Sequence, residues 1–465
     1  MNTKIRWLFT VFIIVGSALR VELFWITPPA NAFDDHFEPI QLIMDTGRIP
    51  AKTACWECYQ PPVFYWTSAM IGKSLVASGI ATKSSLPKFL QFLNCLYGIA
   101  TLGVVFLILR LLPLSDFAKL CGFGLLCFLP RHIYLSALHS NDTLSYLAIA
   151  VCVYLLVLIL EKKHPSVWHL LLLSAMVSVT IFTKYTTFII LPTVFLAFVS
   201  IPWWHPVSFR NALAQGIAVL VIPVVLLGSY CMSNQKNYGR ALPFNTAGYR
   251  ALQVQPHDEK KYDFVTFKPW LFIDYPILRP GQLNSFWTLM YAGMWFDTEP
   301  KFIVYTGHDQ WWAIYYGWLN GDNPFPDNAP AGARTSVIQV GSGLEAIGLV
   351  PLFLGLSGLW FLLKEVWRGS AGNRDFVLLL LMFLVLAVFD FAVAVQLAVN
   401  VPVFSAMKSS YILTALPAFC VFTGLGVQEW EKCRGGKLFC GTLLGALFLL
   451  VIIHVFQLAY YWTRF

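Results

Sequence analysis

Apolar runs of about 20 residues alternate with short polar stretches along most of this chain. A run of this length is what a helix needs to cross the hydrocarbon core of a bilayer. The pattern predicts about eleven membrane-spanning helices, over residues 5–27, 88–111, 116–138, 143–161, 168–183, 184–202, 211–231, 343–364, 375–399, 405–427 and 438–461. We therefore expect an all-α polytopic membrane protein.

The composition agrees with this class. Of the 465 residues, 57% are hydrophobic and 12% are charged, and the mean hydropathy of +0.65 lies far above that of a soluble domain. The net charge of +8 is ordinary for basic cytoplasmic loops, so we expect no nucleic-acid partner. No Ala-x-Ala site follows the first apolar run, so we interpret it as a retained span rather than a signal peptide.

Basic residues at the helix ends predict the orientation. The stretch 62–80 contains Lys73 and begins at a Pro-Pro pair, so we expect a juxtamembrane helix at the interface. With this helix at the interface, the N-terminus and all the basic clusters are cytoplasmic, as the positive-inside rule requires. If 62–80 crossed the membrane instead, every later segment would lie on the opposite side. The clusters are Lys4/Arg6, Arg110/Lys119, Lys162/Lys163, Arg210, Lys364/Arg368/Arg374 and Lys432/Arg434/Lys437.

This topology divides the chain into three parts. Residues 1–231 form a transmembrane core that includes a first outer loop, 28–87, with juxtamembrane helices. Residues 232–342 form a large outer loop that is rich in Trp, Tyr and Phe, so we expect it to fold over the bundle. Residues 343–465 carry the last four helices.

Polar and ionisable residues gather at the expected outer face. Such groups are costly at membrane depth and suggest function by default. Asp34, Asp35 and His36 follow the first span, and His139, Asn141 and Asp142 follow the third. Lys184 lies between the fifth and sixth spans, and Lys408 lies at the start of the tenth.

Two interpretations stay open for the acids. Asp34 and Asp35 either cap the next helix or supply a general base or a metal ligand. Asp142, in "SND", is in the same way a helix cap, a functional carboxylate, or both.

The basic residues have equivalent alternatives. Lys184 and Lys408 either snorkel to the interface or bind a phosphate, and Tyr411 adds a hydrogen-bond donor near Lys408. Arg131 lies within a span after the kinking Pro130, so it should have a buried partner, for which Asp390 is one candidate.

Cys55 and Cys58 flank Trp56-Glu57 in the first outer loop. A thioredoxin-like site needs a soluble fold for which there is no room, and zinc needs two further ligands, for which His36 and Glu57 are the candidates. A local disulfide in an oxidising compartment is the favoured interpretation.

The order "FDDHF", "YQPPVFYW", "SND", "TKYT", "NYGRALPFN", with an arginine at position 20, resembles the GT-C superfamily. Within it the chain is similar to the protein O-mannosyltransferase and aminoarabinose transferase branch, whose donors are polyprenyl-phosphate sugars. The resemblance covers residues 1 to about 250 and, loosely, 400–427. The acidic pair reads Asp-Asp where the family commonly has Asp-Glu, and the chain ends without the soluble C-terminal domain of some relatives.

The resemblance implies a GT-C-like bundle and an inverting transfer of a hexosyl or pentosyl group. The donor is a polyprenyl or dolichyl phosphate, and the acceptor is a hydroxyl of a lipid, glycan or protein. The site faces the periplasm of a bacterial inner membrane or the lumen of the endoplasmic reticulum. No cofactor is required, although the family is compatible with a divalent metal at Asp34 and Asp35.

Residue roles follow from the same resemblance. Asp34 is the expected base, with Asp35 and Asp142 as the other candidates. Residues expected to hold the donor phosphate are Lys184, Lys408, Arg20, Arg131 and Tyr411, with Arg250 and Arg279 as further arginines. Residues expected to contact substrate are His36, Tyr59, Gln60, His139 and Asn141.

A polytopic transporter or lipid flippase is the alternative from another class. Transporters tend to show inverted repeats and broken helices near the midplane. No similarity between the two halves of this chain is evident, and its charges lie at one face.

Overall fold

The computed structural model describes residues 3–29, 35–161, 165–203, 206–244, 265–277, 285–297, 331–368, 374–400 and 407–464. The regular elements in these ranges are helices. Nine of the helices are long and apolar enough to cross a bilayer, and ten if the bent pair α5 (Asp116–Cys127) and α6 (Pro130–Ala137) counts as one span. The prediction of an all-α polytopic membrane protein is confirmed.

The predicted spans coincide with helices. These are α1 (Thr3–Ile26), α4 (Leu86–Leu111), α5 with α6, α7 (Asp142–Glu161), α8 (Val167–Ile181), η1 (Tyr185–Ile189) with α9 (Ile190–Ser200) and η2 (Ile201–Trp203), α10 (Phe209–Tyr238), α16 (Ala331–Ile347) with α17 (Leu349–Arg368), α18 (Arg374–Asn400), η5 (Ser409–Ala415) with α19 (Leu416–Glu431), and α20 (Gly436–Arg464). The count falls below eleven because α8 has only 15 residues, too few to span alone.

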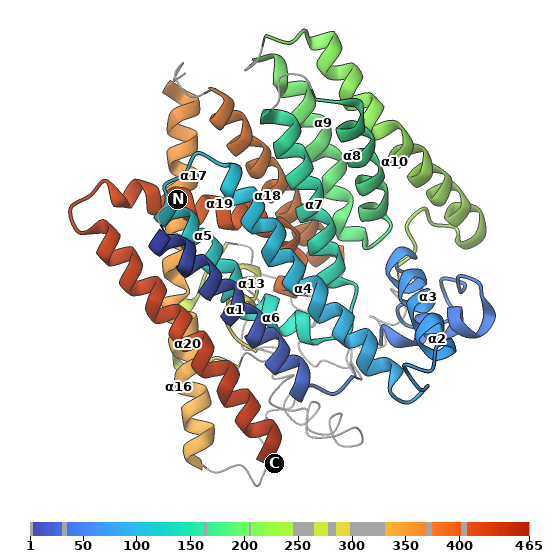
Figure 1. Ribbon diagram of the computed structural model, residues 1–465, viewed down its shortest axis with the longest axis horizontal. Helices are drawn as coiled ribbons and strands as arrows, with labels where there is room; N and C mark the ends of the chain where they lie inside the picture. Colours follow the sequence, from blue (N-terminus) through green and yellow to red (C-terminus); the bar gives the residue numbers. More distant parts are fainter. Residues whose placement is uncertain are drawn as a thin grey trace.

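The first outer loop forms a small unit beside the bundle. Its helices α2 (Phe37–Thr46) and α3 (Val63–Ala77) pack on each other next to the start of α4 (Figure 1). Ile40, Ile43 and Phe64 are fully buried in this unit. Since α3 has 15 residues, it is too short to span the bilayer, in agreement with the predicted juxtamembrane helix.

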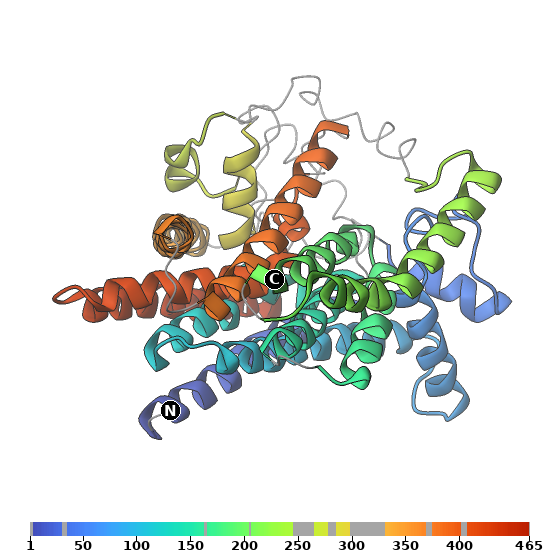
Figure 2. The ribbon, with the colours of Figure 1, turned by 90° about the horizontal axis from the view of Figure 1, so that it is seen from above.

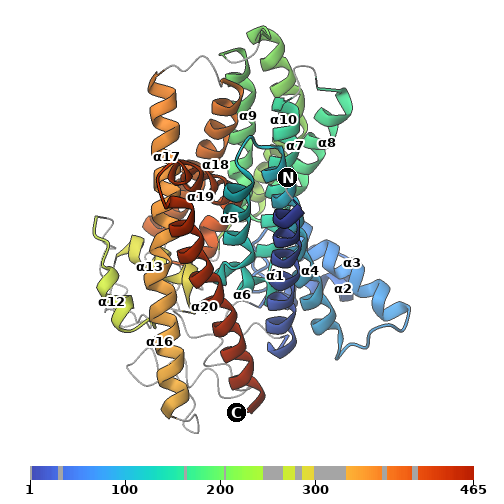
Figure 3. The ribbon, with the colours of Figure 1, turned by 60° about the vertical axis from the view of Figure 1, so that its left-hand side comes forward.

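The described parts of the large outer loop lie on the opposite flank. They include α12 (Pro269–Asp274) and α13 (Phe286–Trp295). Figures 2 and 3 show this pair on one side of the bundle and α2 with α3 on the other. Beside α12, the long helices α16 and α20 run next to each other (Figure 3).

The α5–α6 break is bridged by a buried arginine. The two helices are bent by 44°, and Pro130 begins α6. Arg20 of α1 is fully buried and donates to the carbonyls of Leu126 at 3.0 Å, Cys127 at 3.0 Å and Gly16 at 2.7 Å. Because a broken helix leaves carbonyls without intrahelical donors in an apolar interior, the guanidinium stabilises this break.

Helices α17 and α19 pack with almost no space between their backbones. A Cβ atom placed on Gly426 would lie 1.9 Å from the carbonyl oxygen of Leu354, and one placed on Gly358 would lie 2.1 Å from that of Phe422. Small residues permit such close helix contact in a membrane. This pair therefore holds α19, and with it η5, in a fixed position.

Several elements begin or end at the end of the bundle that carries α2 and α3. Helix α6 ends there, and α7, η1 and η5 begin there, in mutual contact. The loop ahead of α3 joins them, because the backbone N–H of Val63 donates to the carbonyl of Phe182 at 2.9 Å. The predicted polar residues after the third span and around the fifth, sixth and tenth are thus brought to one place.

Candidate active site

A buried ion pair lies at the centre of this region. Lys184, which precedes η1, donates through Nζ to Oδ1 of Asp142, the first residue of α7, at 2.5 Å. Each residue is only 7% exposed. The hydroxyl of Tyr146 lies 3.1 Å from the same Oδ1 and 2.9 Å from the carbonyl oxygen of Ser410. These contacts join α7, η1 and η5.

The residues around η5 complete this centre. The ring centroid of Tyr411 lies 5.6 Å from Lys184 Nζ, within the range of a cation–π contact. Lys408 directly precedes η5 and is half-buried. Lys184 pairs with the first residue of α7, Tyr411 lies beside Lys184, and Lys408 precedes η5, which contacts α7. These are three of the residues expected to hold a phosphate.

Arg131 is buried close to this centre without a partner. It is the second residue of α6, is 7% exposed, and its Nε is buried. Among the described residues, no hydrogen bond or ion pair to Arg131 is found. The Arg131 guanidinium is close enough to Tyr146 to interact with it electrostatically. Because Tyr146 contacts Asp142, Arg131 lies near the Asp142–Lys184 pair.

The suggested pairing of Arg131 with Asp390 is wrong. Asp390 of α18 is fully buried and accepts a hydrogen bond from the hydroxyl of Thr414 and another from the backbone N–H of Ala415, at 2.9 Å. The packing of α18 against η5 places both of these donors on the carboxylate. The charge of Arg131 is therefore left without an anionic partner in the described residues.

Other buried polar atoms at this end also have no partner. They include Oδ1 of Asn141, Oγ1 of Thr143, Oγ of Ser409 and Nε2 of His139. The amide nitrogen of Asn141 donates to the carbonyl of Thr183 at 3.4 Å. Buried polar atoms are nearly always hydrogen-bonded, so such a group needs an explanation. A polar ligand would satisfy these atoms.

The two histidines lie against the aromatic residues of the first outer loop. His139 is 2% exposed, with its ring 5.7 Å from that of Phe64 and 6.1 Å from that of Phe37. Burial, aided by the nearby charge of His36, lowers the pKa of His139 to about 3. His36 Nδ1 lies 2.8 Å from the hydroxyl of Tyr65. His139 is therefore a neutral imidazole at ordinary pH.

The acidic pair is described at only one of its positions. Asp34 lies outside the described residues, as do Arg250 and Arg279. Asp35 is exposed, and its Oδ1 accepts from the backbone N–H groups of Phe37 at 2.9 Å and Glu38 at 3.2 Å. Asp35 thus caps the N-terminus of α2.

Tyr59 and Gln60 are tied to the same region. The hydroxyl of Tyr185, in η1, donates to the carbonyl of Tyr59 at 2.9 Å. Gln60 Nε2 donates to the Tyr59 hydroxyl at 2.9 Å. Cys55 and Cys58, which form a disulfide, lie directly before them.

Lys52 is a residue that the sequence analysis missed. It is 8% exposed, and its Nζ donates to the carbonyl of Gln60 at 2.9 Å and lies 5.1 Å from the centroid of the Tyr230 ring. Burial lowers the pKa of Lys52 to about 8. A single lysine in a polar loop carries no sequence signal of burial, so only the folded loop identifies it.

Arg20 is separate from this centre. Its guanidinium donates to two backbone carbonyls at the α5–α6 break and to that of Gly16 in α1, and it lies 2.8 Å from Nδ1 of His132. Of its nitrogens, only Nε has no partner. The structure therefore gives Arg20 a role in the bundle core.

The described side chains do not form a divalent-metal site. Within the part of the chain that the structure describes, no three His, Cys, Asp or Glu side chains are grouped so as to hold a metal. The carboxylate of Asp142 is bound by Lys184, and that of Asp35 caps α2. An ammonium group already occupies the place that a cation would take beside Asp142.

The sequence matches no protein-family model and no curated protein. Solved structures do match. The oligosaccharyltransferase of Archaeoglobus fulgidus, in its apo form, aligns with 98% of this chain at a TM-score of 0.53 and 11% identity. The archaeal enzyme AglB from the same organism, in complex with an inhibitory peptide and a dolichol-phosphate, aligns with 98% at a TM-score of 0.52.

These alignments cover only part of the archaeal enzyme. This chain spans 56% of its length, a little over half. ArnT from Cupriavidus metallidurans bound to undecaprenyl phosphate aligns with 91% of this chain and 78% of its own at 15% identity, with a TM-score of 0.37 that supports no further argument. At these identities the alignments establish the fold alone: the chain shares the transmembrane fold of the archaeal oligosaccharyltransferase, in agreement with the GT-C-like bundle that the sequence resemblance implies.

Proposed function

We propose that this protein is an integral membrane glycosyltransferase. It transfers a sugar from a polyprenyl or dolichyl phosphate to an acceptor hydroxyl on the non-cytoplasmic face. The observation that carries the proposal is the buried polar centre of Asp142, Lys184 and Arg131, of which Arg131 has no partner within the described ranges. An enzyme with the same transmembrane fold has been captured with a dolichol-phosphate, which belongs to the proposed donor class.

The basic residues suit a phosphate leaving group. As the bond between the anomeric carbon and the phosphate oxygen breaks, the phosphate leaves with the electron pair and gains negative charge. Arg131, Lys184 and Lys408 supply positive charge there, and fixed cations in a site from which water is excluded stabilise such charge strongly. Arg131 is the most suitable of the three, because its guanidinium has no hydrogen-bond or ion-pair partner among the described residues.

Asp34 is the proposed general base. It takes the proton of the acceptor hydroxyl as the oxygen attacks the anomeric carbon from the face opposite the phosphate, which inverts that centre. The other two acids are less suited to this role. Asp35 caps α2, and the ion pair with Lys184 makes Asp142 a weaker proton acceptor.

Sugar and acceptor contacts belong to the residues around this centre. Oδ1 of Asn141 and Nε2 of His139 lack partners, so they are available to sugar hydroxyls. His36, Tyr59 and Gln60 lie on the outer-loop side of the same region. In the proposed three-part division, residues 232–342 contact the acceptor, 1–231 bind the donor, and 343–465 complete the bundle.

The test is sugar transfer by the protein in nanodiscs. Labelled polyprenyl-phosphate sugars, hexosyl and pentosyl, are offered with a membrane extract as acceptor, and donor binding is measured separately. Asp34→Asn should bind donor but lose at least about 100-fold in transfer, the lower part of the range for a general base. Asp35→Asn is the matched control, because Asn keeps the helix cap while removing the same charge.

Two results would count against the proposal. Equal transfer by Asp34→Asn and wild type would remove Asp34 as the base. If the wild type bound none of the donors, the glycosyltransferase proposal would fail, and a transporter or flippase of another lipid would explain the fold better.

A further inference from the structure

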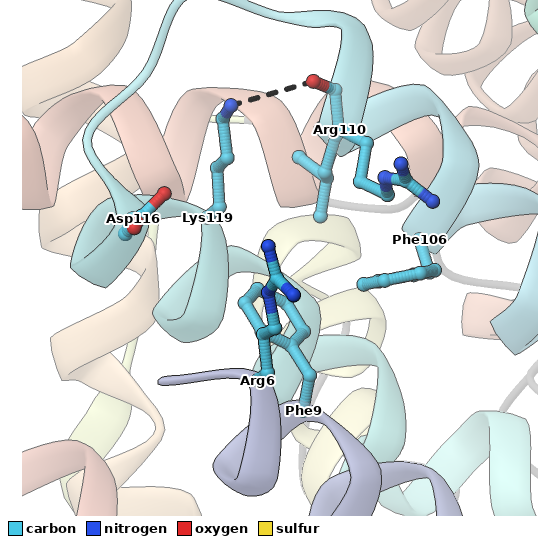
Figure 4. Close-up of a pocket in the computed structure, with 7 residues that line it drawn as sticks. Arg6, Phe9, Phe106, Arg110, Asp116 and Lys119 are labelled. Carbon is cyan, nitrogen blue, oxygen red and sulfur yellow. Dashed lines mark hydrogen bonds between the residues drawn. The ribbon is translucent and has the colours of Figure 1, made fainter. Parts of the chain in front are cut away.

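A polar cavity lies at the end of the bundle opposite the candidate active site. It has a volume of about 510 Å³. Three cations from three different helices line it: Arg6 of α1, Arg110 of α4 and Lys119 of α5 (Figure 4). Asp116 is the only acid among its lining residues. The cavity therefore carries a formal excess of positive charge.

These cations are held in place around the cavity. Lys119 Nζ donates to the carbonyl of Arg110 at 3.4 Å, and the Arg110 guanidinium lies 5.8 Å from the centroid of the Phe106 ring. The side chain of Arg6 extends from α1 into the space below the other two (Figure 4). The three cations are far apart in the sequence, and the packing of their helices brings them around one cavity.

The rest of the cavity is apolar and lies beside lipid-facing surface. Phe9 and Leu109 line it and are 3% and 1% exposed. The neighbouring side chains of Trp7 and Leu8 on α1 are 67% and 43% exposed. Because helix ends with exposed apolar side chains lie in the bilayer, acyl chains can continue along α1 from a headgroup in the cavity.

We propose that this cavity binds the phosphate-bearing headgroup of an anionic phospholipid. Basic pockets between transmembrane helices are suited to such headgroups. The apolar wall and the exposed apolar side chains favour a lipid over free phosphate, because only the lipid uses both surfaces. The site is distinct from the proposed active site, and its existence does not depend on the activity.

The experiment measures lipid retention by the full-length protein with native mass spectrometry. Phosphatidylglycerol is compared with phosphatidylcholine, with and without inorganic phosphate. The wild type should retain phosphatidylglycerol preferentially. The Arg6→Gln/Arg110→Gln variant should lose about 30-fold in affinity, the effect of removing two cations near a membrane surface. A matched control, Arg210→Gln/Arg434→Gln, removes two exposed basic residues that do not line the cavity and should behave as wild type.

A salt titration of the wild type keeps the test independent of any variant that fails to fold. Retention should fall as salt rises, because the headgroup is held by charge. Equal retention of both lipids, or no salt dependence, would overturn the proposal. So would unchanged retention in the folded Arg6→Gln/Arg110→Gln variant. Release of the lipid by inorganic phosphate alone would make this a free-phosphate site and overturn the choice of a lipid.

Discussion

Two buried arginines at the same helix break differ in their surroundings. Arg20, on α1, is fully buried and donates to three carbonyls, two at the α5–α6 junction and one in α1. Arg131, just beyond that junction on α6, is 7% exposed and has no hydrogen-bond or ion-pair partner in the described residues. A buried charge without partners is strongly unfavourable, whereas one surrounded by acceptors is tolerated. The difference separates an arginine that holds the fold from one available to a ligand.

The largest effect on stability should come from Arg20→Gln. Glutamine has fewer donors than arginine, so buried carbonyls at the break lose their hydrogen bonds, and we expect a loss of about 3 kcal/mol in stability. Thermal melting in detergent measures this loss. Sugar transfer per folded molecule should stay near the wild-type value. Normal melting with lost donor binding would instead make Arg20 a phosphate ligand, as the family resemblance implies.

Arg131→Gln should give the opposite result. Removing one preorganised charge from a transition state costs about 10²–10³-fold in rate, or about 3–4 kcal/mol. Melting should be unchanged or higher, because an unpaired buried charge is removed. Steady-state transfer and melting of the same preparation measure both effects. A melting temperature that falls as far as that of Arg20→Gln would show that Arg131 is structural.

His139 extends the comparison to a buried group that is neutral. Burial lowers the pKa of His139 in the folded protein to about 3, from the ordinary value of 6.5. As pH falls from 6.5 toward 3, His139 becomes protonated in the unfolded chain but not in the folded protein. The free energy of unfolding therefore falls by about 2 kcal/mol by about pH 5. Melting against pH should show this slope in the wild type and in His169→Gln. The slope should be weaker in His139→Gln, and an unchanged slope there would contradict the assignment.

The smallest effect should come from the Cys55–Cys58 disulfide. It closes a loop with a sequence separation of only 3, so its chain-entropy contribution is between about 1 and 2 kcal/mol. Cys55→Ser/Cys58→Ser should therefore melt slightly below wild type, and reductant should lower wild type to the same point. If reductant destabilised the protein as much as Arg20→Gln does, the disulfide would contribute as much to stability as the buried arginine, which would contradict this estimate.

The apolar periodicity was sufficient to predict the spans, because bilayer thickness requires long runs that polar residues interrupt. It overestimated the length of α8, which is too short to cross the bilayer alone. The residues that gather around Asp142 could be anticipated as a group, since topology brings their helix ends to one face. Their partners could not be anticipated. The sequence analysis suggested Asp390 as a partner of Arg131 and did not identify Lys52 at all, because side-chain packing decides both cases.

The way in which the helices start at the polar centre determines what it can hold. Helix α7 begins at Asp142, η1 begins directly after Lys184 and leads into α9, and η5 begins directly after Lys408 and leads into α19. Aligned peptide dipoles place roughly half a positive charge at each helix N-terminus. Several such ends in contact create a positive potential that belongs to the backbone and that no substitution removes. Variants with neutral residues in place of both Lys184 and Lys408 should therefore still prefer anions. The backbone then determines that the ligand is negatively charged, and the side chains determine where it binds.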